Sequence, residues 1–85
     1  MTTLERVRKV VAEVMRVPAD TLDPAARIED LGETDSLTLA EIATALDAEF
    51  VVRVPSDDLA DARSVADLVA LVERLTAQSE ATPAS

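Results

Sequence analysis

The stretch Leu31-Gly32-Glu33-Thr34-Asp35-Ser36-Leu37 decides how the chain is organised, because it joins a glycine, a capping carboxylate and a hydroxyl. Gly32 is the only glycine in the sequence. Since glycine is favoured where the backbone needs a positive φ or a close approach, we expect a loop to end here. The following residues predict a helix from Ser36 to about Phe50, with apolar residues at positions 39, 42, 43, 46 and 50.

Asp35 or Thr34 is the expected N-cap of this helix, since either side chain can accept a hydrogen bond from an N–H group of the first turn. Ser36 then lies in that turn. The free N–H groups and the positive end of the helix dipole favour a phosphate ester on its hydroxyl. A serine beside a helix start is often only a cap, but here Asp35 can already supply the cap.

The residues around Ser36 resemble the acyl carrier protein family. Asp35-Ser36-Leu37 opens an acidic amphipathic helix, follows Leu31-Gly32 and precedes Leu46 and Phe50, and the resemblance extends from about residue 4 to residue 75. It implies that Ser36 carries 4′-phosphopantetheine, attached covalently from coenzyme A by a phosphopantetheinyl transferase. It also implies a carrier, not an enzyme, that holds an acyl or aminoacyl group as a thioester.

The composition excludes most enzyme classes. The chain has no cysteine and no histidine, so it lacks a thiolate, an imidazole base and the usual zinc ligands. Any thiol must therefore arrive with a cofactor. The acidic loop residues do not form a calcium site either, because setting Gly32 at the sixth position of an EF-hand loop puts Arg27 first and Thr38 twelfth.

The net charge of −9 is concentrated in the middle of the chain, where residues 17–61 carry two basic and twelve acidic side chains. Such a field repels nucleic acid and attracts basic protein surfaces. No apolar run approaches the roughly 18 residues of a membrane span, and the N-terminus lacks the pattern of a signal peptide. We therefore expect a cytoplasmic protein that binds neither nucleic acid nor membranes.

The remaining sequence predicts three more helical segments. Residues 2–16 have an apolar stripe at helical spacing and a capping box at Thr2 and Glu5, and Pro18 ends the helix. Residues 18–35 then form a long loop, which we expect to be held by Leu22, Ile28 and Leu31. Loops of this length in small domains are usually functional.

The second half predicts a short acidic helix over residues 56–61, capped by Ser56, and a last helix opened by a capping box at Ser64 and Asp67. We therefore expect an all-α fold, a small four-helix bundle with three longer helices and one short one. The expected division is a carrier domain over residues 1–76 and a disordered tail over residues 77–85, which is small and polar and contains Pro83.

The resemblance also suggests the residues that contact partner enzymes. Acidic residues of the second helix dock on basic patches in the family, which gives a primary set and a secondary acidic patch, although each charge can equally belong to an ordinary solvated face. Leu37 lies off the apolar stripe and is a candidate contact. The primary set is Asp35, Leu37, Glu41 and Asp47, and the secondary patch is Asp57, Asp58 and Asp61.

Apolar residues of the predicted helices are core by default, but family members also open a gap between helices to shelter the acyl chain. Small residues at positions 40, 43, 45 and 48 could leave such a gap, although alanine is also simply the best helix former. The candidate acyl pocket consists of Ile42, Leu46, Phe50, Val54, Leu59, Leu68 and Val72.

The chain departs from the pattern of fatty-acid carriers in the loop before Ser36 and in the second helix, and the fewer charges on that helix imply a different set of partners. Two residues, Glu33 and Thr34, separate Gly32 from Asp35 where many fatty-acid carriers have one, and Thr38, Thr44 and Ala48 replace acidic residues or methionine. We expect a free-standing, monomeric carrier of a specialised pathway, polyketide-like or aminoacyl, served by a loading ligase or a ketosynthase. The alternatives are a fatty-acid carrier, a peptidyl carrier and a small acidic helical adaptor without a prosthetic group.

Overall fold

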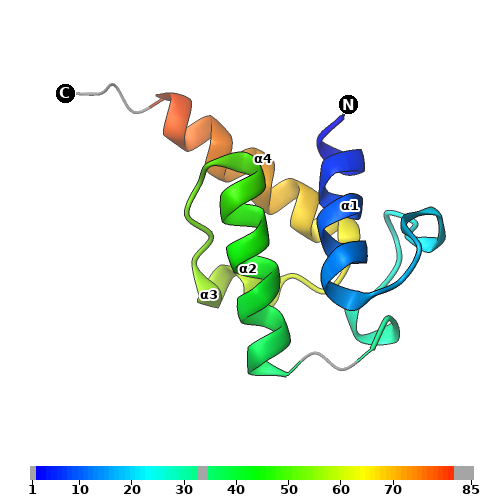
Figure 1. The fold of residues 1–85 in the computed structure, drawn as a ribbon. Helices are drawn as coiled ribbons and strands as arrows, with labels where there is room; N and C mark the ends of the chain where they lie inside the picture. Colours follow the sequence, from blue (N-terminus) through cyan, green and yellow to red (C-terminus); the bar gives the residue numbers. More distant parts are fainter. Residues whose placement is uncertain (1, 33–34, 82–85) are drawn as a thin grey trace.

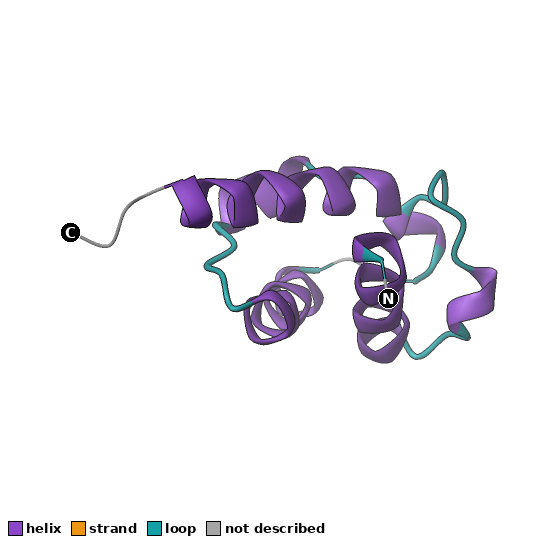
Figure 2. Ribbon diagram, turned by 90° about the horizontal axis from the view of Figure 1, so that it is seen from above, coloured by secondary structure: helices purple, strands orange, loops and turns teal. Residues whose placement is uncertain are grey.

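The computed structural model describes residues 2–32 and 35–81, with only the backbone of residues 79–81. These residues form four α-helices, α1 Thr3–Met15, α2 Ser36–Phe50, α3 Ser56–Asp61 and α4 Val65–Ala81, and two 3-10 turns, η1 Ala19–Thr21 and η2 Ile28–Asp30. α1 and α2 run antiparallel to each other (Figure 1). Figure 2 shows these two helices nearly end-on with α4 running across them. The expected bundle of three longer helices and one short one is confirmed.

The predicted boundaries of α1 and α2 follow from caps that the sequence reveals. The Thr2 hydroxyl accepts a hydrogen bond from the Glu5 N–H at 3.2 Å and starts α1. Both helices end on a residue in the left-handed conformation, Arg16 after α1 and Val51 after α2. Neither residue is a glycine, so this conformation carries a backbone cost at both positions.

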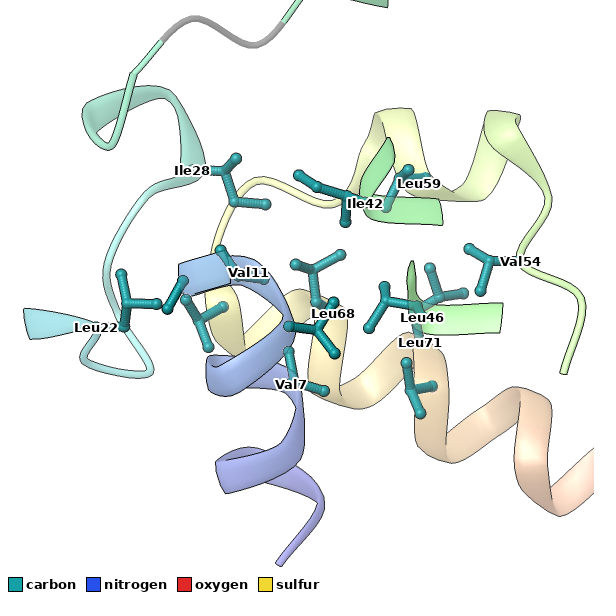
Figure 3. Packing of buried hydrophobic residues seen from close by; sticks show 14 residues of the cluster. Val7, Val11, Leu22, Ile28, Ile42, Leu46, Val54, Leu59, Leu68 and Leu71 are labelled. Atoms are coloured by element: carbon teal, nitrogen blue, oxygen red, sulfur yellow. The ribbon is translucent and has the colours of Figure 1, made fainter. Parts of the chain in front are cut away.

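The core is one cluster that draws on every α-helix and on the first loop (Figure 3). Leu22 and Ile28 from the loop insert into it beside Val7 and Val11 of α1, as the sequence predicts. Leu31, the third predicted loop anchor, is half-buried against the cluster. Each fully buried aliphatic side chain contributes roughly 1.5 to 3 kcal/mol, so these insertions hold a loop that has little regular structure of its own.

Backbone hydrogen bonds tie the first loop to the segment before α4. The N–H of Ile28 donates to the carbonyl of Arg63 at 2.9 Å, and the N–H of Val65 donates to the carbonyl of Ala26 at 3.0 Å. Arg27 and Ser64 thereby form an isolated antiparallel bridge. The loop that precedes Ser36 and the segment that joins α3 to α4 therefore form one connected frame.

Two expectations about the second half are corrected. Ser56 is the first helical residue of α3 and not its cap, because Pro55 occupies the N-cap position and no side chain caps this helix. α4 continues to Ala81, so the expected tail is helical over residues 77–81, and the rest of it lies outside the described residues. Alanine, glutamine and glutamate at positions 77, 78, 80 and 81 are good helix formers, and Pro83 is the first residue that opposes the helix. The Ser64 cap of α4 is confirmed, since the Asp67 N–H donates to the Ser64 hydroxyl at 3.2 Å. The second bond of the capping box differs, because the Asp67 carboxylate accepts the N–H of Arg63 and not that of Ser64.

Candidate functional site

Ser36 is the first residue of α2 and is exposed. Asp35 precedes it as the N-cap, and one of its carboxylate oxygens accepts the Thr38 N–H at 2.8 Å. This hydrogen bond lowers the pKa of Asp35 below its ordinary value of 3.8. Within the described residues the Ser36 hydroxyl takes part in no hydrogen bond, so it is available for modification while Asp35 does the capping.

The loop before Ser36 depends on a glycine, as the sequence predicts. Gly32 has a φ of 153°, a value that residues with a side chain rarely adopt. A Cβ atom at this position would also lie 3.3 Å from the terminal methyl of Met15 at the end of α1. The alternative cap Thr34 and its neighbour Glu33, the pair that departs from the family spacing, lie outside the described residues.

Two hollows flank the start of α2. An apolar groove of about 520 Å³ lies between α1 and α2, and we call it the α1–α2 groove; its lining comprises Val14, Leu37, Ala40, Glu41, Thr44, Ala45 and Ala48. The second, of about 270 Å³, is the α2–α3 hollow; it is lined by Ile28, Glu29, Leu39, Ala60, Ala62 and Arg63. Leu37 and Leu39 are two residues apart, about 200° around a helix, so they point to different sides of α2.

Leu37 is the exposed apolar residue next to the candidate serine, with 67% of its surface accessible. It forms part of the α1–α2 groove together with Glu41, whose carboxylate forms no ion pair within the described residues. The structure thus brings Asp35, Ser36, Leu37 and Glu41 together on the first two turns of α2.

Two acidic residues of α2 are engaged within the protein. The Asp47 carboxylate accepts the Val54 N–H at 2.7 Å and so fixes the chain after α2. Glu49 binds Arg6 of α1 at 2.9 Å, and this Arg6 hydrogen bond is the main cause that lowers the pKa of Glu49 below 4.5. The Arg6 guanidinium also lies 4.3 Å from the centroid of the Phe50 ring. Fewer acidic side chains of α2 are therefore available to contact a partner than its sequence suggests.

The predicted secondary patch lies on α3. Asp57 and Asp61 are exposed, and Asp58 is half-buried and pairs with Arg74 of α4 at 3.2 Å. Two of the three carboxylates thus form no ion pair in the part of the chain that the structure describes.

The predicted acyl-pocket residues lie in the packed interior. Phe50 is half-buried, and the other six are at most 6% exposed: Ile42, Leu46, Val54, Leu59, Leu68 and Val72. Both hollows beside Ser36 are lined by other residues. The α1–α2 groove includes Ala40, Ala45 and Ala48, three of the alanines that the sequence suggests as the source of a gap, but it faces outward from the core. Opening of the core around an acyl chain stays a prediction.

Sequence reasoning missed the α2–α3 hollow entirely. Its residues come from three separate stretches of the sequence, 28–29, 39 and 60–63, and nothing in the sequence pattern brings them together. The repeat of small residues at positions 40, 44 and 48, one helical turn apart, is the signal that could have revealed the α1–α2 groove.

The described residues contain no group of histidine, cysteine, aspartate or glutamate side chains that could hold a metal ion. No described helix is both long enough and apolar enough to cross a membrane.

Comparison with known proteins agrees with this geometry. The family model described as "Phosphopantetheine attachment site" matches residues 5–72. The acyl carrier protein of Helicobacter hepaticus is 38% identical over 74 residues, which cover 86% of this chain and 96% of that protein. The chain therefore belongs to the acyl carrier protein family, whose members carry a phosphopantetheine group.

Membership of this family makes the chain a non-catalytic carrier with covalently attached 4′-phosphopantetheine, served by a phosphopantetheinyl transferase and by the enzymes of its pathway. The residues present fit this group. An exposed, unengaged hydroxyl lies at a helix N-terminus, where backbone N–H groups favour a phosphate, and the cap it would otherwise supply comes from Asp35.

Proposed function

We propose that Ser36 is the attachment residue and that the chain presents a thioester-bound acyl or aminoacyl group to the enzymes of a specialised biosynthetic pathway. The observation that supports it best is the exposed Ser36 hydroxyl beside a separate N-cap. In the modification, a P–O bond forms at the Ser36 oxygen, the hydroxyl proton leaves to a base of the transferase, and adenosine bisphosphate departs from coenzyme A. The thiol at the end of the arm then holds the cargo.

The specialised role is supported by how few free charges α2 presents. Asp47 and Glu49 are engaged in contacts within the protein. Three further positions of the helix carry uncharged residues, Thr38, Thr44 and Ala48. The docking surface we propose is therefore the first half of α2, with Asp35, Leu37 and Glu41 beside the α1–α2 groove. It suits a partner with an apolar side chain for the groove and a cation for Glu41, such as a loading ligase or a ketosynthase. We propose that this carrier is monomeric and acts in the cytoplasm.

Intact mass tests the attachment residue. The folded protein is incubated with coenzyme A, magnesium and a promiscuous phosphopantetheinyl transferase. Ser36→Ala is expected to abolish the mass gain. Ser56→Ala is the matched control, because Ser56 is also exposed and also the first residue of a helix. Modification that persists in Ser36→Ala overturns the assignment, and no modification of the folded wild-type protein favours an adaptor without a prosthetic group.

The cargo is identified by incubating the modified protein with extract from its source organism and measuring the mass of the thioester. A polyketide intermediate or an aminoacyl group is the expected result. Saturated fatty acyl groups alone would identify the housekeeping carrier instead.

A further inference from the structure

Met15 is the last residue of α1 and carries one of the two sulfur atoms of the sequence, the other being that of Met1. The sequence has no cysteine, so these thioethers are its only sulfur groups until the arm brings a thiol. Met15 is half-buried against the core, which leaves part of its side chain open to a molecule as small as hydrogen peroxide. Methionine is oxidised to the sulfoxide by such reagents.

The methyl group of Met15 packs against the loop that leads to Ser36. A Cβ atom on Gly32 would lie 3.3 Å from this methyl, so the methyl occupies the side of Gly32 on which any other residue would carry its side chain. Gly32 follows η2, which the buried Ile28 anchors in the core. The contact therefore connects the end of α1 with the chain that approaches Ser36.

Both sides of this contact are fixed by their own elements. Arg16, the residue after Met15, ends α1 in the left-handed conformation. On the other side, the N–H of Leu31 donates to the carbonyl of Ile28 at 3.0 Å and closes η2 just before Gly32. A change in the Met15 side chain is therefore expected to alter the position of Gly32, because neither element can shift as a whole without losing these contacts.

We propose that Met15 is a site of reversible oxidation by hydrogen peroxide, and that its sulfoxide displaces Gly32 and slows the attachment of the arm to Ser36. A lone pair of the Met15 sulfur attacks one oxygen of the peroxide, and the O–O bond breaks. The other oxygen leaves as water after it takes the proton of the transferred oxygen. The sulfur thus loses two electrons, the peroxide is reduced, and a polar sulfoxide replaces an apolar thioether.

The sulfoxide oxygen does not fit this contact. If the oxygen stays among apolar neighbours, it is an acceptor that needs a donor which an apolar contact does not supply. If it turns to water, the methyl group rotates away from Gly32. Methionine sulfoxide reductases reverse the oxidation. The effect on Ser36 rests on the proposed function, whereas the oxidation of Met15 and its effect on Gly32 do not.

The test uses the full-length protein before the arm is attached. The protein is treated with hydrogen peroxide, the peroxide is removed, and intact mass then follows the modification of Ser36 by coenzyme A and the transferase. The tryptic peptides of residues 1–6 and 10–16 report Met1 and Met15 separately. Oxidation of Met15 is expected to slow the modification roughly two- to fivefold, the size expected when a contact beside the site is weakened and the site itself is intact.

Gly32 gives a second readout that does not depend on the arm. It is the only glycine, so its backbone amide signal in NMR is readily assigned, and this signal is expected to move when Met15 is oxidised. Met15→Leu is the matched control, because it keeps an apolar side chain and leaves Met1 as the only thioether. Peroxide should change neither its Gly32 signal nor its rate of modification. Reductase treatment of the oxidised wild-type protein should restore both.

Four outcomes overturn the inference. A peptide 10–16 that stays unoxidised while Met1 is fully oxidised would show that peroxide does not reach the Met15 sulfur. An unmoved Gly32 signal in the fully oxidised protein would separate Met15 from the loop. An unchanged rate of that protein would separate the loop from Ser36. Equal slowing of wild type and Met15→Leu would assign the effect to general damage.

Failure of the proposed function is recognised separately. A folded wild-type protein that is not modified at Ser36 before any peroxide is added contradicts the proposed function. The peptide masses and the Gly32 signal then still decide whether Met15 is oxidised and whether its sulfoxide reaches the loop.

Discussion

Val51 is a residue whose backbone conformation is unfavourable for its side chain. It ends α2 with a φ of 53° and is 85% exposed. A β-branched side chain is a poor fit to the left-handed conformation, and almost nothing packs against this one. Burial of the Val51 side chain therefore does not offset the cost of its backbone conformation.

Val51→Gly is expected to stabilise the protein. Removing the side chain relieves a left-handed cost of about 1 to 2 kcal/mol, and the extra freedom of glycine in the unfolded chain offsets about 0.4 to 1 kcal/mol of it. The free energy of unfolding, measured with urea, should rise by the difference. Val52→Gly is the control and should be destabilising, because Val52 is half-buried against the core. A lower stability for Val51→Gly would mean that the side chain has a contact which its exposure does not suggest.

Glu49 makes the stability of the folded protein depend on pH. Its pKa is lowered in the folded state, mainly by the hydrogen bond from Arg6. The stabilisation is therefore present above the unfolded value of about 4.5 and is lost as the pH falls through the lower folded value. Comparing the Tm of wild type and Glu49→Gln across this range should show a gap at pH 7 that narrows in acid. A gap that widens in acid would contradict the sign.

At the scale of the element, α2 divides its acidic residues between two tasks. Glu41 points to the α1–α2 groove, whereas Asp47 bonds to the chain that follows the helix. The sequence cannot separate them, because both are carboxylates on one amphipathic helix. The structure therefore predicts that substitution of Asp47 lowers the stability of the fold, whereas substitution of Glu41 slows the modification of Ser36.

Asp47→Ala should reduce stability. It leaves the N–H of the buried Val54 without its acceptor, a loss of about 1 to 3 kcal/mol. Asp47→Asn keeps an oxygen acceptor and should lose much less. Urea unfolding measures both variants. Equal stability of Asp47→Ala and wild type would show that this hydrogen bond is replaced by water at no cost.

Glu41→Lys should leave stability nearly unchanged and slow the modification of Ser36. The charge reversal opposes the approach of a basic transferase, so the decrease in rate should be larger at low salt than at high salt. Initial rates of mass gain at several salt concentrations measure it. Glu73→Lys, on the exposed face of α4, is the control. Equal rates for Glu41→Lys and wild type at every ionic strength would remove Glu41 from the docking surface.

At the scale of the whole molecule, the sequence predicts the features that follow from apolar periodicity and from capping residues, which are the helix starts and the buried anchors of the first loop. Thr2, Asp35 and Ser64 each start a helix where expected, and Leu22 and Ile28 anchor the first loop. It does not predict what depends on distant pairs. Arg6 meets Glu49 across 43 positions, and the α2–α3 hollow joins η2 to α3. Such contacts are set by how the helices pack, which a pattern along one segment does not contain.

The end of α4 gives a test of the predicted domain boundary at residue 76. Val72 is the last buried core residue of the part of the chain that the structure describes, so a chain shortened after Thr76 keeps the whole described core. We expect it to fold, to take up the arm and to lose less than about 1 kcal/mol, since helix ends contribute little to global stability. Urea unfolding and intact mass test this expectation. Failure to fold would assign residues 77–81 to the domain.

The central claim, that the exposed hydroxyl at the start of α2 carries the arm, is tested most directly by mapping the modified residue. Trypsin releases the peptide of residues 28–53, in which Ser36 is the only serine. We predict that fragmentation of this peptide from the modified wild-type protein places the phosphopantetheine on Ser36. Finding the group on a threonine of that peptide, or on one of the other serines, Ser56, Ser64, Ser79 and Ser85, would contradict the account.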